Sequence, residues 1–358
     1  MTLNNPLPTV DFLSKPLQWI LLVFFGSLVL YYGKVFFTPL LFGLLIAMIM
    51  YPACKKMETK GLSRTVAISI ILLFVTALMV AIIWLLNVQV HIFLDKLPLL
   101  TERLSGTSEQ AMFWLEEAFG IGISDQTVFF NKFTENAESS VGKIVTSIFS
   151  ATISTLVLLL LTPIFSALFL YHRGTFVRFL ESIVSKEHHK KLHRIVNESI
   201  LSYFKFAKGT FYVYCIVGVL NSIGLLLLGI ENAIVYGLIA ALMTIIPYIG
   251  IFISAAIPVS IAYLTKDSMW YPIGVIVIFT LVQYLEANVI YPKVVGAQLN
   301  LSTWATLVGI VIGTIIWGIA GMILITPLLA ILKIVSDYIP QWKPVNLLLN
   351  RAEGYQGK

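Results

Sequence analysis

The sequence contains few charged residues and only two cysteines. Asp, Glu, Lys and Arg make up 12% of its 358 residues, whereas about 25% is usual for a soluble domain. Hydrophobic residues reach 58%, and the mean hydropathy is +0.90. This composition excludes an ordinary soluble domain and indicates an integral membrane protein. Cys54 and Cys215 lie far apart with no ligand spacing around either, so they indicate neither metal nor redox chemistry.

The motifs of common catalytic sites are absent as well. The sequence has no GxSxG, no HExxH, no GxxxxGK[ST] and no paired intramembrane aspartates. His189 and His193 are spaced i, i+4, but they lie among lysines and are typical of a solvated surface. We therefore expect no enzyme activity, no metal and no cofactor. Without a nucleotide-binding motif, uphill transport would need an ion gradient or a partner subunit.

The net charge of +6 raises the question of a nucleic-acid partner. Lys and Arg, however, gather in loops beside apolar spans, as residues that orient a chain in a membrane do. We therefore expect the lipid bilayer to be the partner of this chain, and we expect no nucleic acid.

Apolar stretches long enough to cross roughly 30 Å of hydrocarbon predict an all-α, polytopic helical membrane protein with about eight spans. In chain order these stretches are 17–33, 35–51, 65–90, 144–171, 211–229, 233–248, 250–264 and 271–291. A further apolar tract, 303–338, would be about 50 Å long as one helix. A re-entrant hairpin or a bent pair of helices is therefore expected there.

These stretches divide the chain into six segments. They are a three-span region (1–90), a small external helical insertion (91–143), a fourth span (144–171), a cytoplasmic amphipathic segment (172–210), a transport core with broken helices (211–338) and a cytoplasmic tail (339–358). Basic residues fill the loop after the second span and the segment 172–210, whereas acidic residues outnumber basic ones in 91–143. This pattern predicts cytoplasmic loops, an external insertion and two cytoplasmic termini in the cell inner membrane.

Polar residues interrupt the apolar stretch 271–291, and Glu286 is the most informative of them. An ionisable group inside a span costs roughly 2.5–3.5 kcal/mol on insertion scales, so it usually faces a partner or a water-filled path. One interpretation is a structural ion pair with Lys293, two helical turns away; the other is a transport path. Gln283 shares a helical face with Glu286 at i, i+3. The candidate path residues in this region are Gln283, Glu286, Asn288, Pro292 and Gly296.

Helix-breaking residues interrupt two other apolar tracts. Pro247, Tyr248 and Gly250 form one break, which either exposes carbonyl groups to a substrate or makes a tight turn between two spans. Small residues in the final tract allow close helix approach, and a proline is expected to end or kink the run. The residues of this second group are Gly309, Gly313, Gly318, Gly321 and Pro327.

Four segments together resemble the autoinducer-2 (AI-2) exporter family of bacterial and archaeal permeases. They are PLLFGLLIAMIMYP (39–52), IPYIG (246–250), QYLEANVIYPKVVG (283–296) and GIVIGTIIWGIAGMILITPLLAILK (309–333). The resemblance implies a permease of about eight spans that assembles as a homo-oligomer. It also implies that some relatives export signal molecules and that others exchange sodium or lithium for protons.

We therefore expect a permease or secondary transporter that exports a small solute or a signal molecule such as AI-2. One alternative is a sodium(lithium)/proton antiporter, because the Glu286 carboxylate could take up a proton or, with Gln283 and carbonyls near Pro247, offer oxygen ligands to sodium. A second alternative is a membrane scaffold that does not transport and would tolerate Glu286→Leu.

Overall fold

The computed structural model describes residues 15–85, 160–247, 249–295 and 299–351, together with positions 87, 88, 99 and 158. In this part of the chain the regular structure is helical, apart from one isolated bridge between Leu301 and Asn350. The prediction of an all-α, polytopic membrane fold is confirmed. The external insertion predicted at 91–143 lies outside the described residues, with the single exception of Leu99.

The helices follow one another with short connections. They are α1 (Lys15–Tyr32), α2 (Lys34–Thr59), two helices without labels (Arg64–Leu85 and Leu160–Tyr171), α5 (Arg173–Ile183), α6 (His189–Leu227), α7 (Ala233–Met243), α8 (Ile249–Thr265), α9 (Trp270–Leu285), α10 (Tyr291–Val294), α11 (Thr303–Trp317), α12 (Ile319–Tyr338) and α13 (Lys343–Leu349). A five-residue π-helix, Glu286–Ile290, connects α9 to α10.

Several of these helices match the thickness of a membrane. Among the described residues, five are long and apolar enough to cross one: Lys34–Thr59, Arg64–Leu85, Lys186–Leu227, Trp270–Val294 and Ile319–Tyr338. Shorter apolar helices accompany them, including α7, α8 and α11. The chain is therefore a multi-pass membrane protein.

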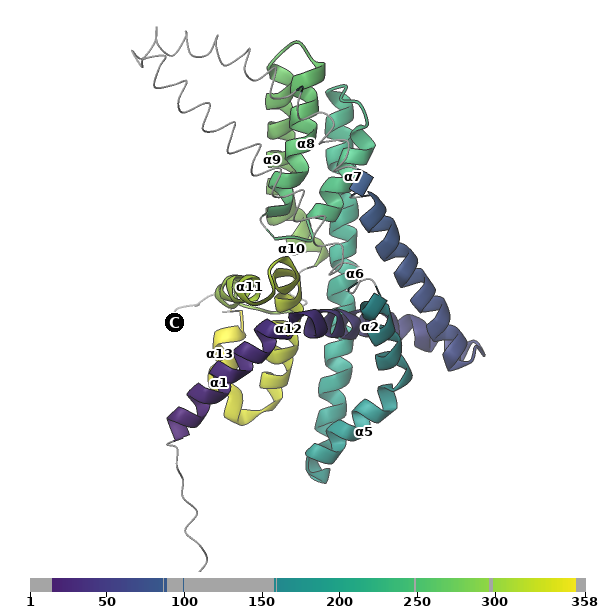
Figure 1. Cartoon of the computed structure of the whole chain (residues 1–358), viewed down its shortest axis with the longest axis vertical. Helices are drawn as coiled ribbons and strands as arrows, with labels where there is room; N and C mark the ends of the chain where they lie inside the picture. The colour runs from purple at the N-terminus through teal and green to yellow at the C-terminus, as the bar shows by residue number, and fades with distance from the viewer. Residues whose placement is uncertain are drawn as a thin grey trace, which may run out of the picture.

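The long helix α6 organises the molecule. It has 39 residues, about 58 Å in length, and it runs vertically through Figure 1. The helices α7 and α9 pack against it, and so do α2 and α12. Figure 1 shows α7, α8 and α9 at one end of the molecule, while α1, α2, α11, α12 and α13 lie nearer the other. A single helix, α6, covers residue 210, where the sequence predicts that an amphipathic segment gives way to a span.

Separate apolar clusters hold these groups together. Leu225 of α6, Tyr236 of α7, Ile261 of α8 and Phe279 of α9 are buried in one cluster. A second cluster joins α2 to the helices Arg64–Leu85 and Leu160–Tyr171, and a third joins α2 to α12. A fourth, which includes Val213, Val217, Val282 and Val295, lies where α6 meets α9 and α10. The apolar faces of the helices therefore account for the packing.

The helices α7 and α8 form a hairpin whose first arm is short. The 11 residues of α7 extend only about 16 Å, so this helix does not cross a membrane alone, contrary to the span expected at 233–248. A turn at 244–247 separates the two helices. Gly250, at the start of α8, is buried, and a Cβ atom there would overlap the carbonyl oxygen of Met243. The break predicted around Pro247 is thus a tight turn that requires glycine.

The final apolar tract is a second hairpin, made of α11 and α12. Gly318 ends α11 and begins α12 with φ +63°, a conformation that glycine adopts without strain. The two arms touch at Gly313 and Gly321, and Gly309 contacts Leu329. The predicted pair of helices is therefore found. Pro327 does not end the run, however, because α12 continues through it to Tyr338.

Ser302 anchors the start of this hairpin. Its Oγ accepts a hydrogen bond from the backbone N–H of Ala305 at 3.1 Å and donates one to the carbonyl of Leu348 at 2.8 Å. We expect Ser302→Ala to lower the free energy of unfolding by about 1 kcal/mol, because an N-cap hydrogen bond is lost. Ser260→Ala is the control, since the Ser260 hydroxyl only donates to Ala256, one turn back in the same helix. Equal loss of thermal stability in detergent for both variants would contradict this role.

Candidate functional site

Glu286 lies at the point where α9 stops being a regular α-helix. The π-helix begins at this residue, and the N–H of Tyr291 donates to the Glu286 carbonyl, five residues back. π-helical turns of this kind are rare and frequently occur at functional sites. Figure 1 shows α10, which follows the π-helix, at mid-height between the α7–α9 group and the α11–α12 hairpin. The π-helix that begins at Glu286 therefore leads to α10, near the junction of the two groups of helices.

The side chain of Glu286 is buried and incompletely paired. Only 8% of the residue is exposed, and its Oε2 atom has no hydrogen-bond partner among the described residues. Lys293 is exposed, and no ion pair joins it to Glu286 in this part of the chain. The structure thus does not form the structural ion pair that was one interpretation of the sequence. A buried carboxylate without a partner is unfavourable unless it binds a proton or a cation.

Two tyrosines of neighbouring helices interact electrostatically with this carboxylate. Tyr214 of α6 and Tyr291 of α10 lie within electrostatic range of Glu286. Thr210, one helical turn before Tyr214, has a buried Oγ1 atom without a partner among the described residues. Gly209 allows the close approach, because a Cβ atom there would lie 3.2 Å from the carbonyl oxygen of Val294. α6 and the π-helix therefore each carry one buried oxygen without a partner among the described residues, Thr210 Oγ1 and Glu286 Oε2.

The other predicted path residues are placed differently. Gln283 is half-buried, and no hydrogen bond connects it to Glu286 within the described ranges. Asn288 is exposed, and its Nδ2 donates to the carbonyl of Tyr284 at 2.9 Å, so it bonds to its own helix. Pro292 is exposed, and Pro247 is half-buried in the α7–α8 turn. Tyr248 and Gly296 lie outside the described residues.

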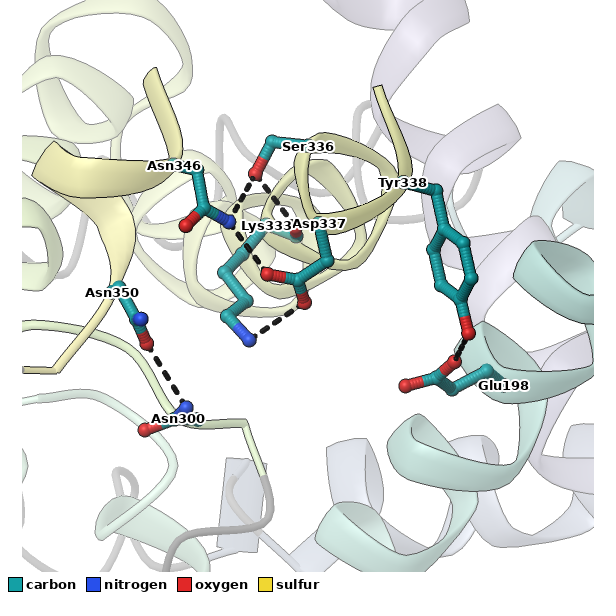
Figure 2. A network of polar contacts seen from close by, with 8 residues as sticks. All are labelled: Glu198, Asn300, Lys333, Ser336, Asp337, Tyr338, Asn346 and Asn350. Carbon is teal, nitrogen blue, oxygen red and sulfur yellow. Dashed lines mark hydrogen bonds and ion pairs between the residues drawn. The ribbon is translucent and has the colours of Figure 1, made fainter. Parts of the chain in front are cut away.

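A polar network at the end of α12 was missed by the sequence analysis. Lys333 Nζ contacts Asp337 Oδ2 at 2.7 Å, and Asn346 of α13 donates to Asp337 Oδ1 at 2.6 Å and to Ser336 Oγ at 3.0 Å. Figure 2 shows these residues together, with Tyr338 on the other side of the helix pointing toward Glu198. The signal was Lys333 and Asp337 spaced i, i+4 on an otherwise apolar helix.

These contacts connect three helices. The Tyr338 hydroxyl donates to Glu198 Oε2 of α6 at 2.5 Å, and Asn300 donates to Asn350 Oδ1 at 3.0 Å. Because Lys333 is 9% exposed and paired, its charge is compensated within the protein. The network therefore fixes the end of the α11–α12 hairpin to α6 and α13, as Figure 2 shows, and it is structural in character.

A large cavity lies between α2, α5, α6 and α12. It measures about 1240 Å³ and is lined by α2, α5, the first turns of α6 and the end of α12. No spacing in the sequence indicated it, because its walls come from three stretches that lie far apart in the chain, 44–51, 169–200 and 331–341. The histidines of this region have protein partners: His193 Nε2 lies 2.7 Å from Glu181 Oε1, and His189 Nε2 lies 3.0 Å from the Glu181 carbonyl. In the described part of the chain, no three His, Cys, Asp or Glu residues gather as metal ligands.

Known proteins are similar to this chain over nearly its full length. The model of the AI-2E family transporter matches residues 19–341. YueF of Bacillus subtilis (strain 168) is 25% identical over 348 residues, which cover 89% of this chain and 92% of YueF. YhhT of Escherichia coli (strain K12) is 25% identical over 300 residues, which cover 83% of each chain. The AI-2 transport protein TqsA of Escherichia coli (strain K12) is 26% identical over 315 residues, 87% of this chain and 89% of TqsA. Because the family model matches nearly the full length, this chain belongs to the AI-2E family of transporters.

Proposed function

We propose that this protein is a permease that exports a small polar solute or signal molecule, such as AI-2, across the cell inner membrane. The observation that carries the proposal is Glu286, a buried carboxylate with an unpartnered oxygen at the start of a π-helix. Ionisable residues in spans usually mark the path of a substrate or an ion. The name of the relative TqsA supports AI-2 as the first solute to test.

The two helical hairpins support the same conclusion. Transporters commonly place their binding sites beside helices that are interrupted within the membrane, because a break frees backbone groups and helix ends. Here α7–α8 turns near Gly250, and α11–α12 turns at Gly318. The π-helix at Glu286 is a third interruption. It lies in the span that follows the α7–α8 hairpin and precedes the α11–α12 hairpin in the sequence.

A second candidate function is exchange of sodium or lithium for protons. It is favoured by the unpaired Glu286 Oε2 and Thr210 Oγ1 atoms, which belong to the π-helix and to α6, two elements in contact with each other. Oxygen atoms of this kind bind hard cations, and the carboxylate can carry a proton instead. In this function Glu286 would bind a proton and a cation in turn, and the transported solute would be the cation itself.

The orientation of the chain forms part of the proposal. We place both termini in the cytoplasm, because the basic residues of 172–210 and of the loop after α2 favour that side. The large cavity, α5 and the polar network at the end of α12 then lie toward the cytoplasm as well.

Purified protein in liposomes loaded with AI-2 tests the proposed function. We expect AI-2 to leave these liposomes faster than it leaves protein-free liposomes, and we expect Asn288→Ala to behave as the wild type because Asn288 bonds only to its own helix. AI-2 is measured in the external buffer over time. Efflux no faster than from protein-free liposomes, under imposed sodium and proton gradients of either direction, would contradict AI-2 export.

A further inference from the structure

The cavity beside α5 is too large and too apolar for a small polar solute. Its volume of about 1240 Å³ exceeds the roughly 300–1,000 Å³ of ordinary small-molecule sites. Most of its lining side chains are apolar and come from α2, α5, α6 and α12. The site is also distinct from the junction that contains Glu286, which does not line it.

The apolar face of α5 lines this cavity and is not covered by the protein. Phe176, Phe179 and Leu180 all line the cavity and are 44%, 60% and 38% exposed. No residue of α5 is buried, although the helix is strongly amphipathic. Amphipathic helices with aromatic residues on the apolar face typically lie at the boundary between headgroups and acyl chains. The surroundings of α5 therefore favour an occupant with a long apolar chain.

The charges around the cavity favour an acidic head on that occupant. Arg173, Arg178 and Lys191 line the cavity, and Glu181 is the acidic residue among the lining side chains. Glu181 is paired with His193 at 2.7 Å. Arg173 is paired with Glu58, whereas Arg178 and Lys191 form no ion pair among the described residues. These two basic side chains therefore leave the cavity with an excess of positive charge.

Two polar atoms in the wall lack partners. Arg173 Nη2 contacts Glu58 Oε2, whereas Arg173 Nη1 is buried without a hydrogen-bond partner among the described residues. Ser199, also in the wall, is 6% exposed, and its Oγ has no partner within the same ranges. Buried donors nearly always have acceptors. A phosphate oxygen would satisfy the guanidinium and, where it reaches, the hydroxyl.

We propose that this cavity binds an anionic phospholipid of the cytoplasmic leaflet. The acyl chains lie against the apolar face of α5, and the phosphate accepts hydrogen bonds from Arg173 Nη1. Basic pockets between spans at the cytoplasmic side bind acidic headgroups for the same reason, because the lipid supplies both the charge and the apolar chain. Such a lipid would fill the space between α5 and α6 and hold α5 at the membrane surface.

Native mass spectrometry of the full-length protein in detergent tests this site. The probes are phosphatidylglycerol and phosphatidylcholine with identical acyl chains. We expect the wild type to retain phosphatidylglycerol preferentially. Lys191→Gln should weaken that binding about fivefold, which corresponds to about 1 kcal/mol for one basic residue. Lys186→Gln removes the same charge from an exposed residue outside the cavity wall and should leave the binding unchanged.

A second variant fills the cavity without touching its charges. Gly174 lines the cavity, and a Cβ atom there would meet no atom within 4 Å, so Gly174→Trp should project into the space and keep the fold. We expect it to weaken the binding of both lipids at this site at least tenfold. Equal retention of the two lipids by the wild type would overturn the proposal. Unchanged retention of phosphatidylglycerol by Gly174→Trp would also overturn it. If the tryptophan variant does not fold, unchanged retention of phosphatidylglycerol by Lys191→Gln would overturn it instead.

The same spectra and assays exclude other occupants. A change in subunit number for Gly174→Trp, with lipid retention unaltered, would show that a second copy of the chain fills the cavity. Loss of AI-2 efflux with unaltered lipid retention would show instead that the cavity belongs to the solute path. Either result would replace the lipid as the occupant.

Discussion

We expect Glu286→Gln to remain folded and, under the proposed cation/proton exchange, to show no proton movement when sodium or lithium is pulsed across the membrane. Glutamine keeps the size of the side chain and most of its hydrogen-bonding ability, but it cannot bind and release a proton. The residue is 8% exposed, and its Oε2 atom has no hydrogen-bond partner among the described residues. No other acid in this part of the chain is bonded to Glu286, so none is placed to take over its proton. The measurement uses proteoliposomes with a trapped pH dye. We expect the variant to give the signal of protein-free liposomes.

Two further variants make this result specific. Asn288→Ala, two residues away, should retain the wild-type signal because its side chain is exposed and bonds to Tyr284 of its own helix. Glu286→Leu should be as inactive as Glu286→Gln if the protein transports, whereas a scaffold would tolerate it. Normal cation-driven flux in Glu286→Gln at several pH values would refute the coupling role. A wild type that moves AI-2 but no protons would assign Glu286 to the solute path alone.

Gly321→Ala is expected to destabilise the protein strongly. The arms of the α11–α12 hairpin touch at Gly313 and Gly321, and a Cβ atom on Gly321 would overlap the carbonyl oxygen of Gly313. Because that neighbour is backbone, the hairpin has to open for the methyl group to fit. Overpacking of this kind usually costs about 1–3 kcal/mol and occasionally more. Thermal unfolding in detergent measures the loss, and transport activity should fall with it.

Gly26→Ala provides the matched control for this substitution. Gly26 lies in the exposed α1 helix, and a Cβ atom there would meet no atom within 4 Å. Alanine is a better helix former than glycine by about 0.5–1 kcal/mol. We therefore expect the control to be as stable as the wild type or slightly more stable. If both variants unfold at the same temperature, the close contact at Gly321 does not limit stability.

Part of the candidate site could be predicted from the residues alone. Glu286 stands out because a carboxylate in an apolar span is expensive wherever the span packs. Its surroundings could not be predicted, since Tyr214, which interacts with it electrostatically, comes from α6, more than seventy residues earlier in the chain. Asn288 shows the limit clearly: helical spacing does not reveal that its amide turns back to its own backbone.

The sequence by itself determined the membrane class, the positions of the helix breaks in the second half of the chain and the choice of Glu286 as the candidate residue. Composition sets the solvent of a chain, and Gly and Pro act locally on the backbone, so neither needs tertiary information. Only the tertiary structure decided that α6 continues across residue 210, that the helix following α9 becomes a π-helix at Glu286, and that a cavity remains beside α5. These features depend on which side chains from distant segments meet, and packing between segments is not encoded in the spacing within any one of them.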